Sequence, residues 1–284
     1  MFYRSSGRAL LYSRDRLVAN TMANTKKREG GRNAIVTGAS RKLGIGAAVA
    51  RALARDGWNV LTTCWRPYDA AMPWGSRNDE AEELIRELKR HRVRAALHED
   101  DLGDPLSAKR IFEAAENQIG PVRGLVNVHA YSTDGGLTDT TIEQFDRHIA
   151  VNARGTFILS AEFARRSRGP AGSGRIVNFS SGLPLKGEIA YAASKGAIEW
   201  ITVSSAAELA SRGITVNAIN PGPNDTGWMP PRRRKQIAAR TPLGRVGLPQ
   251  DAASFVAFLC SQGAGWIIGQ IIDCDGGWST LLRD

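Results

Sequence analysis

The chain has 284 residues, 42% hydrophobic and 23% charged, which is typical of a soluble protein with one large or two small domains. No apolar run approaches the roughly 20 residues of a transmembrane helix, so we expect no membrane partner. The formal net charge is +10, but +6 of it lies in residues 1–32, so we expect no nucleic-acid partner, which would need a basic domain surface.

Residues 1–32 form a basic N-terminal extension with few acidic side chains. Such a composition is also found in targeting segments. Met22, however, offers a second start just before the first predicted strand. We therefore expect residues 1–32 to be disordered or an artefact of the start site, and residues 33–284 to form one domain.

Short apolar runs alternate with helical patterns from Asn33 onward. The predicted strands are Asn33–Thr37, Val60–Thr63, Ala95–Leu97, Gly124–Val128, Arg175–Phe179, Ile214–Ile219 and Gln270–Asp273. The predicted helices are 45–57, 79–91, 104–120, with Asp104 as N-cap and Pro105 in the first turn, 141–168, 191–211 and 249–261. The pattern predicts a doubly wound α/β domain with a seven-stranded parallel sheet. Functional residues are expected just after the strands.

The first predicted strand runs into a glycine-rich loop with Gly38, Gly44 and Gly46. A loop between a strand and a helix lets the backbone approach a pyrophosphate, and the helix N-terminus attracts the negative charge. The alternative is an ordinary tight turn.

A tyrosine and a lysine, Tyr191 and Lys195, stand four residues apart in a predicted helix. They would share one helix face, and a nearby ammonium group would lower the pKa of the phenol. Such a phenol can act as a general acid toward a carbonyl oxygen. Two polar segments, 178–182 and 217–226, end neighbouring strands and strengthen this interpretation.

From Asn33 to Trp278 the chain resembles the classical short-chain dehydrogenase/reductases, and among them the 3-oxoacyl-(acyl-carrier-protein) reductases. The resemblance implies a Rossmann-type fold and the catalytic residues Asn152, Ser181, Tyr191 and Lys195. It also implies cofactor contacts by Gly38, Ser40, Gly44, Ile45, Gly46, Asp101, Leu102, Asn127, Tyr191, Lys195, Pro221, Gly222 and Thr226.

The resemblance further implies a mechanism. NADPH would deliver hydride to a small-molecule carbonyl substrate, and Tyr191 would donate the proton. Ser181 would position the carbonyl oxygen, and Lys195 would lower the tyrosine pKa and hold the nicotinamide ribose. Asn152 would support a water-linked proton relay to Lys195.

The chain departs from the family pattern in four places. Five residues instead of three separate Gly38 from Gly44, and the usual Asn-Asn-Ala-Gly after the fourth strand is Asn-Val-His-Ala at 127–130. The loop before Tyr191 is short, which leaves Ser180 as an alternative to Ser181. The aromatic segment 64–75 is either a subfamily feature or ordinary surface packing.

Two other functions compete with carbonyl reduction. The related enoyl reductases place lysine seven residues after their tyrosine, where this chain has Ile198. A non-catalytic NADP-binding sensor or scaffold would not require Asn152, Ser181, Tyr191 and Lys195 together. The basic run 230–235 lies where the family carries a substrate lid, and is either a solvated face or a contact for an anionic thioester on an acyl carrier.

Cofactor choice depends on the end of the second strand. The position at which NAD-selective sites carry an acid is Cys64, and Asp69 lies five residues further on. Arg41, Lys42 and Arg66 are expected to gather near this position, which predicts NADP(H).

Three cysteines, odd in number and far apart, argue against disulfides and favour the cytoplasm. Four histidines lack metal-ligand spacing, so we expect no metal. The resemblance implies a homotetramer or dimer through the helices near 141–168 and 191–211 and the last strand.

A protein that starts at Met22 should keep its fold and activity, because the predicted sheet begins near Asn33. Circular dichroism and cofactor oxidation check this. An insoluble or inactive shortened protein would contradict the prediction.

Overall fold

The computed structural model describes residues 31–282 except residue 78 and residues 168–173, 182–185 and 228. Almost all of the predicted extension, residues 1–30, lies outside the described residues. No helix in the described part of the chain combines the length and apolar character needed to cross a membrane.

One parallel sheet organises the fold. Its strands are β1 (Asn33–Val36), β2 (Asn59–Cys64), β3 (Ala95–Glu99), β4 (Gly124–Asn127), β5 (Gly174–Phe179), β6 (Ile214–Asn220) and β7 (Ile271–Asp273). The strand order is β3-β2-β1-β4-β5-β6-β7, with Ile35 of β1 in register with Leu61 of β2 and Leu125 of β4. The predicted seven-stranded parallel sheet is confirmed.

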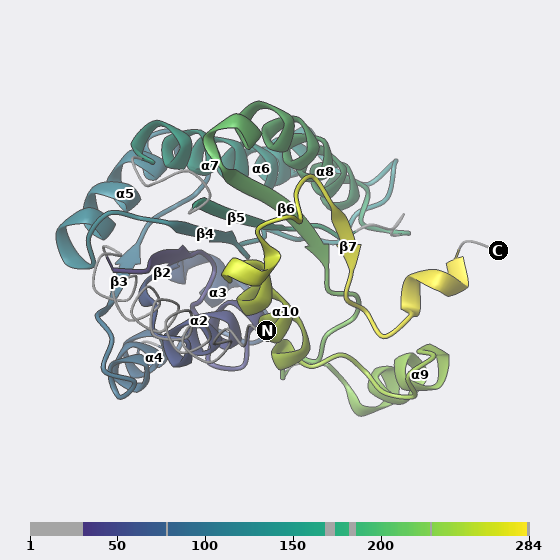
Figure 1. Ribbon diagram of the computed structural model, residues 1–284. Coiled ribbons are helices and arrows are strands. Elements are labelled where there is room, and N and C mark those ends of the chain that lie inside the picture. The colour runs from purple at the N-terminus through teal and green to yellow at the C-terminus, as the bar shows by residue number, and fades with distance from the viewer. Residues whose placement is uncertain (1–30, 78, 168–173, 182–185, 228, 283–284) are drawn as a thin grey trace, which may run out of the picture.

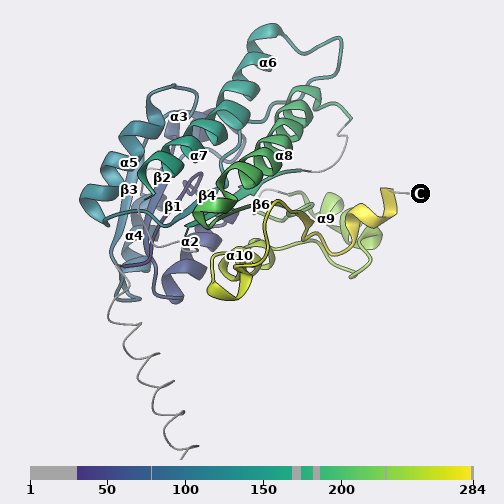
Figure 2. The same cartoon turned by 45° about the horizontal axis from the view of Figure 1, so that its top comes forward.

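Helices cover both faces of the sheet (Figure 1). The α-helices are α2 (Ile45–Arg55), α3 (Arg66–Ala71), α4 (Glu80–Lys89), α5 (Ser107–Gln118), α6 (Ile142–His148), α7 (Gly155–Arg166), α8 (Ile189–Leu209), α9 (Pro231–Arg240) and α10 (Pro249–Leu259). Short 3-10 helices span Ala210–Arg212, Gln262–Ala264 and Trp278–Leu282. Helices α2, α4 and α10 lie on one face, and α5, α7 and α8 on the other. Figure 2 shows α9 beside the C-terminal segment, away from the sheet.

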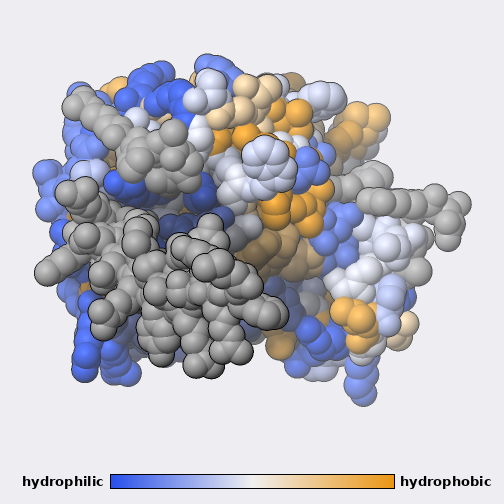
Figure 3. Space-filling view, viewed as in Figure 1, coloured by the Kyte–Doolittle hydropathy of each residue, from blue (hydrophilic) through white to orange (hydrophobic). Residues whose placement is uncertain are grey.

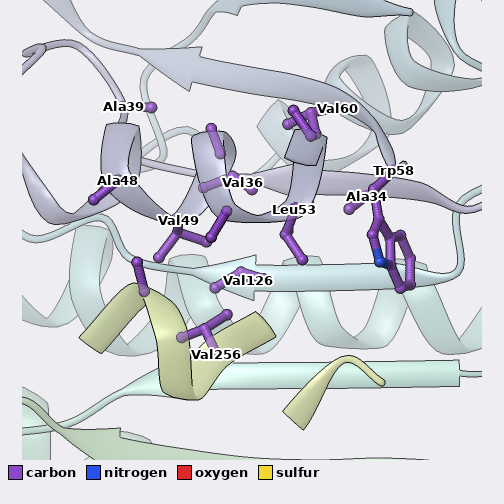
Figure 4. Close-up of a cluster of buried hydrophobic side chains, with 14 of the residues drawn as sticks. Ala34, Val36, Ala39, Ala48, Val49, Leu53, Trp58, Val60, Val126 and Val256 are labelled. Carbon is purple, nitrogen blue, oxygen red and sulfur yellow. The ribbon is translucent and has the colours of Figure 1, made fainter. Parts of the chain in front are cut away.

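The core follows from the alternation of side chains along β1. Ala34 and Val36 pack in the cluster under α2 and α10, whereas Ile35 packs in the cluster on the opposite face. Figure 4 shows Val49 of α2 and Val256 of α10 around β1 and β4. Each fully buried side chain of this size contributes roughly 1.5–3 kcal/mol, so these two clusters fix the helices against the sheet.

The predicted helix 141–168 is interrupted. A capping box starts α6, since Thr141 Oγ1 accepts from Gln144 N and Thr141 N donates to Gln144 Oε1. A π-helical turn, Ile149–Arg154, then separates α6 from α7. Such turns are rare and often lie at functional sites, and this one contains Asn152.

Three further helices, α5, α3 and α9, differ from the prediction. Helix α5 begins at Ser107 rather than at Pro105, because Asp104 Oδ1 accepts from Leu106 N, 2.9 Å away, in a preceding turn. Helices α3 and α9 were not predicted; both have proline in the first turn, where the fixed φ angle favours a helix start.

Candidate active site and cofactor groove

An open groove lies at the carboxyl edge of the sheet, beside the crossing between β1 and β4. Open parallel sheets bind ligands at this place. Gly38, Ser40, Asp101 and Leu102 were predicted contacts and line it. The groove therefore lies at the place where the strand order predicts a ligand site.

The glycine loop is packed too closely for other residues. A Cβ on Gly46 would lie 2.4 Å from the carbonyl oxygen of Gly38, and a Cβ on Gly38, whose φ is +67°, would lie 2.7 Å from His129 Cα. Gly44 caps α2, which begins at Ile45. The first amide groups of α2 are therefore open toward a ligand, as a pyrophosphate site requires.

The altered segment 127–130 is well supported. Thr37 Oγ1 accepts from the backbone N of Val128 and His129, and lies 2.7 Å from His129 Nδ1. Asn127 donates to Asn178 Oδ1 at 2.9 Å, and its own Oδ1 is buried without a partner among the described residues. Asn127, a predicted cofactor contact, therefore links β4 to β5, and its free acceptor points to a missing donor.

Tyr191 and Lys195 share one face of α8, as predicted. Lys195 Nζ lies 5.4 Å from the Tyr191 ring centroid and donates to the carbonyl oxygen of Phe179 at 2.8 Å. Burial lowers the pKa of Lys195 to about 8.

The expected lowering of the Tyr191 pKa is wrong. Burial raises the pKa of Tyr191, and the charges of Glu188 and Tyr68 raise it further. Desolvation disfavours the phenolate and outweighs the nearby ammonium. The hydroxyl therefore stays protonated at neutral pH.

Asn152 uses its side chain to hold the backbone after β4. Its Oδ1 accepts from Tyr131 N at 2.6 Å, and its Nδ2 donates to Tyr131 O and to Ser194 Oγ, both at 2.9 Å. The residue is fully buried. The structure therefore ties Asn152 to Tyr131 and α8 rather than directly to the Lys195 amine.

The two candidate serines differ in their surroundings. The buried Ser180 donates its hydroxyl to Glu199 of α8. Ser181 is half-buried and lies two residues after the end of β5. This difference favours Ser181 as the residue that meets a substrate, and the rest of its loop, 182–185, lies outside the described residues.

The three cations expected near Cys64 do not all gather there. Lys42 pairs with Glu83 at 2.6 Å, on the side of a different surface hollow. Arg66 lies beside Cys64 but is paired with both Glu82 and Glu99. Arg41 lines the same small cavity as Arg66, together with the exposed Arg77, which was not predicted.

Arg41 also connects the segment after β2 with the segment after β6. Its guanidinium lies 4.7 Å from the centroid of the Trp74 ring and donates to the carbonyl oxygen of Thr226 at 2.7 Å. A Cβ on Gly227 would meet Leu43 at 2.6 Å. Arg41 and Leu43 of the lengthened glycine loop therefore reach the segment after β6 that begins with Pro221 and Gly222.

Asp69 lies five residues after Cys64, the position at which NAD-selective sites carry an acid. Helix α3 nevertheless places Asp69 in the wall of the groove. The carboxylate is buried, accepts from Trp74 Nε1 at 2.9 Å and favours the charged form of Arg41. The cavity beside Cys64 therefore contains charges of both signs.

The first half of the aromatic segment lines the groove, through Cys64, Trp65, Tyr68 and Asp69, so for these residues ordinary surface packing is not the whole explanation. Tyr68 lines the groove and its hydroxyl lies 3.2 Å from Ser132 N, while its ring contacts those of Trp74 and Tyr131. Burial raises the pKa of Tyr68 to about 12. The clustering of aromatic residues after the second strand was the signal in the sequence.

Asp101 and Leu102 form the far wall of the groove. Asp101 Oδ1 accepts from Gly103 N at 2.8 Å and from Arg147 at 2.9 Å, and Leu102 is buried beside it. Arg147, in turn, packs over the Tyr131 ring. In the described ranges, no group of three acidic, histidine or cysteine side chains is arranged to hold a metal ion.

The buried Lys195 predicts a pH dependence of stability. Its pKa is 10.5 in an unfolded chain and about 8 in the folded protein, so the unfolded state binds more protons between these values. Stability should therefore rise with pH across this window. The difference in unfolding free energy between the wild type and Lys195→Met should increase by at most about 1.4 kcal/mol per pH unit. Urea unfolding from pH 7.5 to 10 measures it; a constant or falling difference would contradict the prediction.

Comparison with known proteins identifies the family. A family model described as enoyl-(acyl carrier protein) reductase matches residues 38–279. The chain is 42% identical over 249 residues to the uncharacterized oxidoreductase YjdA of Bacillus subtilis (86% of this chain, 96% of that protein), and 34% identical over 252 residues to the 3-oxoacyl-[acyl-carrier-protein] reductase FabG of Staphylococcus aureus (87% and 97%). A short-chain dehydrogenase from Burkholderia cenocepacia, solved in complex with NADP, superposes with a TM-score of 0.78 at 32% identity (89% and 99%). With this sheet, this glycine loop and these matches, the chain belongs to the short-chain dehydrogenase/reductase family of oxidoreductases.

Proposed function

We propose that the protein is an NADPH-dependent reductase that converts a ketone to a secondary alcohol, or catalyses the reverse oxidation. The observation that carries the proposal is the pair formed by the half-buried Tyr191 and the buried Lys195 on α8. The substrate class that we propose is a 3-oxoacyl thioester, because the FabG relative is a 3-oxoacyl-[acyl-carrier-protein] reductase.

The groove offers suitable contacts for each part of the cofactor. The glycine loop and the N-terminus of α2 suit the pyrophosphate, Asp101 and Leu102 suit the adenine, and Arg41 suits the 2′-phosphate. The segment from Pro221 to Thr226 would close over the nicotinamide. Bound NADPH supplies the hydride for the carbonyl carbon.

The chain's own residues handle the proton. The raised pKa of Tyr191 keeps its hydroxyl protonated, as a proton donor must be during reduction. The ammonium of Lys195 stabilises the phenolate that remains. Ser181 donates a hydrogen bond to the substrate carbonyl, and Asn152 supports the proton relay by holding the Tyr131 backbone.

Two features favour this function over the alternatives. Ile198, which stands where enoyl reductases have lysine, is buried in the core, so no cation replaces Lys195 there. In the altered segment 127–130 both ring nitrogens of His129 have a partner, so this departure from the family pattern is accommodated by hydrogen bonds beside the groove.

The substrate side is basic. Helix α9 exposes Arg232, Arg233 and Lys235, while Arg234 pairs with Asp225 at 2.6 Å. Exposed cations attract an anionic thioester or its acidic carrier protein. NADPH oxidation with a panel of 3-oxoacyl thioesters, diketones and quinones tests the substrate class. We also propose a cytoplasmic location, which suits the free Cys64, Cys260 and Cys274.

Replacing Tyr191 with Phe removes the proton donor and little volume. Turnover should fall roughly 10²-fold or more, with NADPH affinity nearly unchanged. Steady-state rates and fluorescence titration measure the two effects. Near-wild-type turnover in the variant would rule out the assigned acid.

Arg41→Ala should reduce the preference for NADPH over NADH more than Arg66→Ala does, because Glu82 and Glu99 already neutralise Arg66. A hydrogen bond to a charged group contributes about 1.5–3 kcal/mol, so we expect at least a roughly tenfold preference in kcat/KM, weakened by salt. Lys42→Ala, paired with Glu83 outside the cavity, is the control. Equal efficiency with NADH at low ionic strength, which Asp69 would favour, would refute the preference.

We also propose a homotetramer or dimer. Trp200 of α8 is 75% exposed and Phe157 of α7 is 55% exposed, and large exposed apolar side chains of this kind suit an interface. Figure 3 shows further apolar patches on one face of the molecule. Light scattering at micromolar concentration should show an oligomer, and Trp200→Glu should weaken it. A single monomeric species in the wild type would be incompatible with this assembly.

A further inference from the structure

We propose that His129 is a positioning residue, whose imidazole holds Asn152 in place by joining the glycine loop to the π-helical turn. The proposal rests on the proposed function, in which Asn152 takes part in the proton relay. His129 stands where the family pattern has alanine, so this connection is a property of this chain.

Both nitrogens of the His129 ring have a partner. Nδ1 lies 2.7 Å from Thr37 Oγ1, and Nε2 lies 3.1 Å from the carbonyl oxygen of Val151. A carbonyl oxygen only accepts, so Nε2 carries the proton and Nδ1 accepts from the threonine hydroxyl. Burial lowers the pKa of His129 to about 3, so the ring is neutral and keeps this one arrangement.

Two glycines bring the ring's neighbours close. A Cβ on Gly38 would lie 2.7 Å from His129 Cα, and a Cβ on Gly155, at the start of α7, would lie 3.2 Å from His129 Nε2. The imidazole therefore fills the space between the glycine loop and the helix that follows the π-helical turn. Its hydrogen bonds act over short, fixed distances.

The contacts form a closed circuit through Asn152. His129 donates to the carbonyl oxygen of Val151, the residue before Asn152. The side-chain oxygen of Asn152 accepts from Tyr131 N, and its side-chain nitrogen donates to Tyr131 O. Tyr131 lies two residues after His129. Because a π-helical turn is a rare form of helix, a hydrogen bond from outside the helix helps to keep Asn152 at this position.

His129→Leu removes both hydrogen bonds and keeps a similar volume. We expect kcat to fall roughly tenfold or more, as for a small displacement of a catalytic group, with the KM for NADPH changed less. His129→Gln can still donate to Val151 and should recover part of the loss. It also provides a folded variant if leucine is not tolerated.

A double-mutant cycle separates positioning from general destabilisation. If His129 acts through Asn152, then His129→Leu with Asn152→Ala should be no slower than Asn152→Ala alone. The matched control is His98→Leu, on edge strand β3, whose effect should multiply with that of Asn152→Ala. The proposal would be overturned if the effects of His129→Leu and Asn152→Ala on kcat multiply. It would also be overturned if His129→Leu keeps the wild-type kcat.

Hydrogen exchange measured by mass spectrometry provides a readout that does not depend on substrate. His129→Leu should speed exchange in residues 149–155 and around Tyr131, and His98→Leu should leave both unchanged. Unchanged exchange in His129→Leu would also overturn the proposal. If exchange speeds up but Asn152→Ala turns over normally, the positioning role stands and the proposed relay fails.

Discussion

Parallel strands end at the same edge of a sheet, and this constraint brings the parts of the site together. The glycine loop follows β1, Cys64 ends β2, Asp101 follows β3, His129 follows β4 and Ser181 follows β5. The chain reverses its direction of winding between β1 and β4, which leaves a crevice between the loops. Residues that are far apart in the sequence can therefore line the same groove.

Burial controls the charges of the candidate catalytic residues. Tyr191 and Lys195 both lose water, which raises the pKa of the phenol and lowers that of the amine. Although the two pKa values move in opposite directions, each shift favours the neutral form of its group. A protonated phenol beside an amine of pKa about 8 is suited to donating a proton near neutral pH. The same burial keeps His129 neutral, so it serves as a fixed connection.

The segment after β2 packs against the glycine loop and the backbone after β4. Helix α3 places Tyr68 against Ser132 and Asp69 beside Arg41, and Trp74 lies under the Arg41 guanidinium. Arg41 in turn reaches Thr226 after β6. The lengthened glycine loop and the aromatic segment are therefore parts of one structure, in which each supports the other.

The sequence alone determined the sheet, because its strands are short apolar runs separated by helical patterns, and it determined the pairing of Tyr191 with Lys195, because four residues span one helical turn. It did not determine the π-helical turn, in which Val151 and Asn152 are hydrogen-bonded to His129, Tyr131 and Ser194, all distant in sequence. Nor did it determine which arginine is available: Glu82 and Glu99 neutralise Arg66 only after α4 and β3 pack beside β2. The pKa of Tyr191 was misjudged for the same reason, since local spacing shows the nearby charge, whereas desolvation is decided by the tertiary structure.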